Sequence, residues 1–116
     1  MSNSPHQLGV SVRRDPDATI VTLAGEVDLR TSPQLRNTLH ELLENRPPRI
    51  IIDLSDVSYV DSSGVGTIVE LKRRAMRSGS DVILVGLQTR VRSVFEITRL
   101  DKFFTIAKDI DEARKV

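Results

Sequence analysis

A run of three isoleucines at residues 50–52 constrains the fold of this chain more than any other feature. Continuous β-branched residues are typical of a strand that is buried on both faces, as happens when helices cover both sides of a mainly parallel sheet. The run ends at Asp53, and after a predicted turn the residues at 61–64, Asp-Ser-Ser-Gly, have the composition of a helix start. A buried strand that leads into a helix is the repeating unit of α/β domains.

The remaining segments extend this pattern into one domain, which suits a chain of 116 residues. Apolar patterns predict further strands at 8–13, 18–24, 81–87 and, less regularly, 103–107. Helical spacing predicts helices at 31–45, 63–77, 89–98 and 109–116. The first two strands form a hairpin, so the order β-β-α-β-α-β-α-β-α predicts an α/β fold with a mixed sheet of about five strands, its later strands parallel, packed with four helices. We expect residues 1–7 to be a flexible leader and residues 8–116 to be the domain.

Composition restricts the class of function. The net charge of +1 is unlike that of nucleic-acid-binding proteins, which usually carry a strongly basic face. The chain has no cysteine, which excludes disulfides and thiol catalysis. No apolar run approaches the ~20 residues that span a bilayer, and the N-terminus lacks a signal core. We therefore expect a cytoplasmic protein that contacts neither nucleic acid nor membrane.

Two polar segments follow neighbouring strands of the predicted sheet, at residues 25–28 and 53–63. Parallel β-α units place their functional loops at the carboxyl ends of the strands, so we expect these segments to meet. The free N–H groups and the dipole of a helix start stabilise a phosphate. A serine at 62 or 63 is therefore either a helix cap or a place where a phosphate is tolerated.

Three segments resemble the STAS domain of the bacterial anti-sigma factor antagonists. They are GEVD at 25–28, DLSDVSYVDSSGVG at 53–66 and VRSVFEITRL at 91–100, of which the second is the most specific. The resemblance spans residues 8–108. Arg99 stands where glycine is common in this family, a departure that we expect to affect a helix end more than the function.

The resemblance implies a partner-switching mechanism without enzymatic activity, catalytic residues, cofactor or metal. An unphosphorylated antagonist binds an anti-sigma factor that is also a serine kinase, and thereby frees the sigma factor. The kinase then phosphorylates the antagonist, and a metal-dependent serine/threonine phosphatase resets it. By its position in the motif, the phosphoacceptor is Ser62. The implied partner-binding residues are Asp28, Leu29, Arg30, Asp61, Ser63, Gly64 and Val65.

The residues of the motif also have structural interpretations. Ser63 can cap the helix while Ser62 faces solvent, and Asp61 is equally suited to an N-cap. Gly64 and Gly66 suggest close approach of the helix start to a neighbour or partner, because glycine has no Cβ. They form no phosphate-binding loop, since the GxxxxGK pattern is absent. Asp28 also fits an ordinary turn.

Other features are interpreted structurally. Lys72, Arg73, Arg74 and Arg77 form a basic run that is expected to be a solvated helix face. His6 and His40 lack the spacing of metal ligands. The chain also has no GxSxG motif, the sharp turn that presents a serine nucleophile.

The alternative function is that of an accessory subunit in a lipid or anion transport complex, without a phosphorylation cycle. A third interpretation, a small-nucleotide-binding protein, has no supporting lysine or glycine-rich loop.

Overall fold

The computed structural model describes residues 8–116, and the predicted leader at 1–7 lies outside the described residues. The strands are β1 (Gly9–Arg14), β2 (Thr19–Val27), β3 (Arg49–Val60), β4 (Asp81–Val85) and β5 (Thr105–Ala107). The helices are α1 (Ser32–Glu44), α2 (Ser62–Arg77), α3 (Thr89–Ile97) and α4 (Ile110–Lys115), with a short 3-10 helix, η1 (Leu100–Lys102). The order of strands and α-helices is the predicted one.

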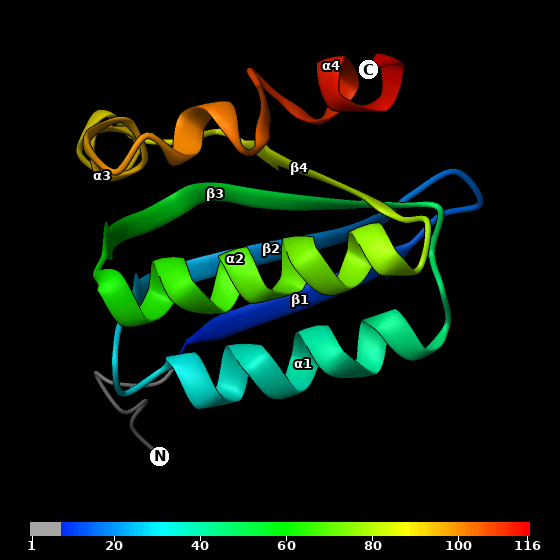
Figure 1. The fold of residues 1–116 in the computed structure, drawn as a ribbon, viewed down its shortest axis with the longest axis horizontal. Coiled ribbons are helices and arrows are strands. Elements are labelled where there is room, and N and C mark those ends of the chain that lie inside the picture. Colours follow the sequence, from blue (N-terminus) through cyan, green and yellow to red (C-terminus); the bar gives the residue numbers. More distant parts are fainter. Residues whose placement is uncertain (1–7) are drawn as a thin grey trace.

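The five strands form one sheet in the order β1-β2-β3-β4-β5 (Figure 1). β1 and β2 pair antiparallel, whereas β2–β3, β3–β4 and β4–β5 pair parallel. The predicted α/β fold with a mixed sheet and four helices is therefore confirmed. Figure 1 shows α1 and α2 side by side along the sheet.

The isoleucine run is buried on both faces of β3, as predicted. Ile50 and Ile52 belong to the main core, together with Leu35 of α1 and Ile68 of α2. Ile51 points to the other face, where it belongs to a smaller cluster that includes Ala113 of α4. Alternate residues of one strand thus pack against helices on opposite sides of the sheet.

The predicted turn after Asp53 is wrong, because β3 continues without interruption to Val60. The polar residues of this segment alternate imperfectly with the buried Leu54 and Val57, and two register shifts against β2 accommodate the irregularity. Pairing with β2 keeps the segment extended. The strand therefore delivers the chain directly to the start of α2.

Arg99 lies between α3 and η1 with φ of 62°, in the left-handed region. Glycine adopts this conformation at little cost, and other residues do not. The departure from the family pattern therefore falls at a helix end, and that it affects this end more than the function stays a prediction.

Candidate functional site

The ends of β2 and β3 meet at the pair Val27 and Val60, so the two polar segments do converge. Asp61 joins them. Its backbone N–H donates to the Val27 carbonyl oxygen at 3.1 Å, and its carboxylate Oδ2 accepts from the Leu29 N–H at 3.2 Å. The other carboxylate oxygen, Oδ1, accepts from the Gly64 N–H at 3.0 Å and caps α2. One side chain thus fixes the loop after β2 to the start of α2.

The interpretation of Ser63 as the cap of α2 is wrong, because Asp61 holds the cap position and makes the cap hydrogen bond. Ser62 is exposed, and Ser63 is partly buried. Neither serine hydroxyl is needed for capping. Because Ser62 is exposed, its side chain is accessible at the surface.

Hydrogen bonds within the loop at 28–31 and to Glu26 define its conformation. The Asp28 carboxylate accepts from the N–H groups of Arg30 at 2.9 Å and Thr31 at 3.2 Å, which confirms Asp28 as a turn residue. The Thr31 hydroxyl donates to the Glu26 carbonyl oxygen at 2.8 Å and accepts from the Asp28 N–H at 2.9 Å, instead of capping α1. The loop presents Leu29 to solvent with 72% of its surface exposed.

Gly64 and Gly66 differ in their surroundings. A Cβ on Gly64 would lie 2.4 Å from the Val27 carbonyl oxygen, so close approach of α2 to β2 requires glycine there. A Cβ on Gly66 would meet nothing within 4 Å, so close approach to a neighbour does not explain this glycine. Gly64 and Val65 are themselves buried, whereas Leu29, Arg30 and Ser62 are exposed.

An open groove of about 450 Å³ lies between α1 and α2 beside the two serines. Leu29, Pro33 and Arg36 line one side, and Ser62, Gly66 and Glu70 line the other. Sequence reasoning did not identify Arg36 or Glu70. The signal was present in α2, where Ser62, Gly66 and Glu70 recur every four residues and so share one face of the helix.

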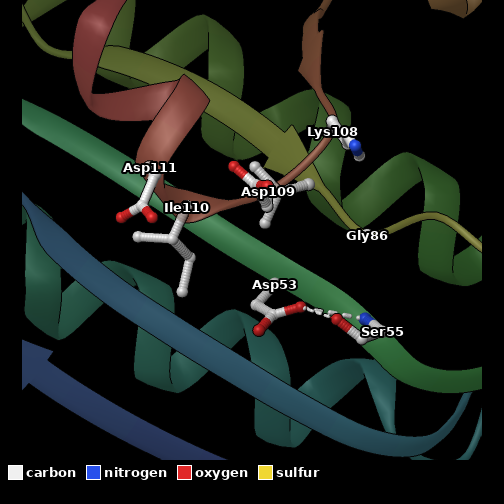
Figure 2. Close-up of a pocket in the computed structure, with 8 residues that line it drawn as sticks. Asp53, Ser55, Gly86, Lys108, Asp109, Ile110 and Asp111 are labelled. Atoms are coloured by element: carbon white, nitrogen blue, oxygen red, sulfur yellow. Dashed lines mark hydrogen bonds between the residues drawn. The ribbon is translucent and has the colours of Figure 1, made fainter.

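A second pocket of about 260 Å³ lies at the carboxyl ends of β4 and β5 (Figure 2). Asp53 and Ser55 line it, together with Lys108, Asp109 and Asp111, and Figure 2 shows the Asp53 carboxylate bonded to Ser55. The predicted polar segment 53–63 therefore divides between two places, since its start lines this pocket and its end lies beside the groove. Within the described part of the chain, no group of three or more metal-ligating side chains occurs here or elsewhere.

The basic run of α2 is partly paired. Arg74 lies 3.6 Å from the Glu70 carboxylate, and the Lys72 ammonium lies 6.0 Å from the centre of the Phe103 ring. Arg73 and Arg77 are exposed, in agreement with a solvated face. None of the helices formed by residues 8–116 is long and apolar enough to cross a membrane.

Comparison with known proteins identifies the class to which this fold and site belong. The family model for the STAS domain matches residues 9–113, so the chain belongs to the STAS domain family. An anti-sigma-B factor antagonist of Listeria monocytogenes is 34% identical over 93 residues, which are 80% of this chain and 82% of the relative. The resemblance stated from the three sequence segments is therefore confirmed.

Two solved structures have the same fold. An anti-sigma factor antagonist from Mycobacterium paratuberculosis superposes with a TM-score of 0.88 at 24% identity, covering 98% of this chain and 97% of the other. The Bacillus cell fate determinant SpoIIAA in its phosphorylated form superposes with a TM-score of 0.71 at 23% identity, covering 92% and 97%.

Proposed function

We propose that this protein is a cytoplasmic, non-enzymatic anti-sigma factor antagonist whose partner binding is controlled by phosphorylation of Ser62. The unphosphorylated protein binds an anti-sigma factor that is also a serine kinase, and so frees the sigma factor. The kinase phosphorylates Ser62, and a metal-dependent serine/threonine phosphatase removes the phosphate. The names of the relatives support the role of anti-sigma factor antagonist.

The observation that carries the proposal is the position of Ser62, exposed at the start of α2 beside an apolar loop residue. The 72% exposed Leu29 offers a contact to a partner, and the groove between α1 and α2 adjoins it. Because Asp61 caps the helix, modification of the Ser62 hydroxyl removes no hydrogen bond that stabilises the fold.

Phosphate at Ser62 would act locally. It adds about −1.5 to −2 charges at pH 7 and three strong acceptor oxygens. These charges would arise beside the carboxylates of Asp28 and Asp61, on a loop and helix start that their hydrogen bonds already hold in place. We therefore expect partner affinity to fall by charge repulsion and steric exclusion, without unfolding of the domain.

The test compares Ser62→Ala, Ser62→Asp and the matched control Ser63→Ala with the wild-type protein. Each is incubated with ATP and the ATPase-fold serine kinases of its native host, and phosphopeptides are mapped. Label on Ser62, absent from Ser62→Ala and retained in Ser63→Ala, supports the proposal. Binding of Ser62→Asp to the labelling kinase should be at least about tenfold weaker, a difference of about 1.4 kcal/mol.

Equal affinity of Ser62→Asp and wild type would count against the switch. In cells, phosphate on Ser62 should change in occupancy between growth and stress. Ser62 unmodified in every condition, with the protein held in a stable complex, would favour the accessory-subunit alternative.

A further inference from the structure

The groove beside Ser62 contains an ion pair that joins the two helices. The Arg36 Nε of α1 lies 3.2 Å from the Glu70 Oε1 of α2. Both side chains are substantially exposed, at 46% and 39%. An exposed ion pair contributes about 0–1 kcal/mol to stability, so it is weak enough to be exchanged for another partner.

Glu70 does not depend on Arg36 for its charge partner. Arg74, one turn further along α2, lies 3.6 Å from the other carboxylate oxygen of Glu70. If Arg36 moved away, the Glu70 carboxylate would therefore keep a cation beside it. The cost of releasing Arg36 is correspondingly small.

Arg36 and Ser62 line one open groove. Ser62 and Glu70 are eight residues apart on the same face of α2, about 12 Å along the helix axis. Gly66 lies between them, and a Cβ there would meet nothing within 4 Å. Ser62, Gly66, Glu70 and Arg36 line the same groove, and Gly66 places no side chain between Ser62 and Glu70 in this row of α2.

A phosphate on Ser62 would meet backbone N–H groups at the helix start, but also a carboxylate beside them. The Gly64 N–H is already bonded to the Asp61 carboxylate, and that carboxylate adds a negative charge at the same place. Asp28 contributes a second carboxylate from the neighbouring loop, where Arg30 is the nearby cation in sequence. Of the side chains that line the groove itself, Arg36 is the cation.

We propose that Arg36 is the intramolecular reader of Ser62 phosphorylation, moving from Glu70 to the phosphate and closing the groove between α1 and α2. This inference rests on the proposed function, because it takes Ser62 as the phosphoacceptor. Guanidinium and phosphate form short, charge-assisted and often bidentate hydrogen bonds, which are stronger than the exposed pair with Glu70. The partner would then meet a filled groove as well as an added negative charge.

The experiment uses protein that carries phosphoserine at position 62, incorporated during synthesis so that no kinase is required. The second pKa of the phosphate is measured by 31P NMR titration. A nearby guanidinium favours the dianion and lowers this pKa, so Arg36→Gln should raise it by about half a unit, a modest shift in keeping with solvent exposure. The matched control Arg73→Gln, which alters an exposed arginine of α2 outside the groove, should leave it unchanged.

Two further variants test the exchange itself. Glu70→Gln should lower the phosphate pKa, because it releases Arg36 toward the phosphate. In the Arg36→Gln background the same change should have little effect, since two groups that act through one another are non-additive. Arg36→Lys should give an intermediate pKa because lysine keeps the charge but loses the bidentate geometry. Far-UV circular dichroism verifies that each variant is folded.

The same phosphate pKa in wild type, Arg36→Gln and Arg73→Gln would overturn the inference, as would an undiminished effect of Glu70→Gln in the double variant. Either result leaves the proposed function intact if phosphoserine at 62 still weakens kinase binding. If phosphoserine at 62 does not weaken kinase binding, the proposed function fails, and the NMR titration still decides the position of Arg36.

Discussion

Replacing Gly64 by alanine places a methyl group 2.4 Å from the Val27 carbonyl oxygen and 2.7 Å from the Val27 Cγ1 atom. The start of α2 and the end of β2 must then separate by about 1.0 Å to restore the 3.4 Å of ordinary contact. Overpacking of this kind costs about 1–3 kcal/mol. Alanine also favours the helix over glycine by about 1 kcal/mol, which partly offsets that cost.

Gly66→Ala in the same helix is the matched control, because its methyl group would enter open space. We expect this variant to be more stable than wild type by about 0.5–1 kcal/mol from helix propensity alone. The propensity gain is similar in both variants, so the difference between them isolates the steric cost. Gly64→Ala should therefore unfold more easily than Gly66→Ala by about 1–3 kcal/mol.

Urea unfolding of the wild type and both variants measures this difference, with the slope m checked for constancy. For an m of about 1.5 kcal/mol/M, a difference of about 2 kcal/mol separates the two midpoints by about 1.3 M. Equal free energies of unfolding for the two alanine variants would refute the reasoning. They would mean that α2 moves away from β2 without cost and that the close contact does not fix the position of Ser62.

Three further predictions concern other contacts. Asp61→Ala should lower the free energy of unfolding by about 1–2 kcal/mol in urea, through loss of the cap and of the bond to Leu29, while Asp61→Asn should keep most of it. Arg99→Gly should raise the free energy of unfolding by about 1 kcal/mol, because it removes the strain of a non-glycine residue in the left-handed region. Thr98→Gly, at φ of −85°, should lower the free energy of unfolding instead. Thermal unfolding measures both changes. A hydrogen bond from Arg114 holds the pKa of Asp15 below its ordinary value of 3.8. This stabilisation is complete above pH 3.8 and is lost as the pH falls through the lower pKa of the folded state. Arg114→Gln should therefore reduce stability at neutral pH and make stability fall less steeply as the pH is lowered. Acid titrations followed by circular dichroism measure this.

The extent of β3 shows where sequence reasoning reached its limit. The isoleucines at 50–52 predict a strand by themselves, since an apolar β-branched run has few other stable environments. The continuation to Val60 contains several polar residues, and its local pattern predicts a turn. Its extended conformation depends on pairing with β2, whose partner residues lie about 30 positions earlier in the chain. The residues of this segment alone do not specify that pairing.

The two glycines of the motif show the same limit at the site. Their sequence environments are nearly alike, and close approach was predicted for both. Only Gly64 faces the Val27 carbonyl oxygen, which comes from a different strand. Helical spacing places Gly66 on the row with Ser62 and Glu70, but the groove exists because α1 packs beside α2.

The sequence by itself therefore determined the order of elements, the two-sided burial of β3 and the placement of Ser62 at a helix start. These properties depend on periodicity and on residue chemistry within a few positions, which are local. The tertiary structure decided that Asp61 caps α2, that Asp53 lies in a different pocket from Ser62, and that Arg36 shares the groove with the serine. Each of these depends on the distance between atoms that are far apart in the chain, and such distances are set by how the strands pair and the helices pack.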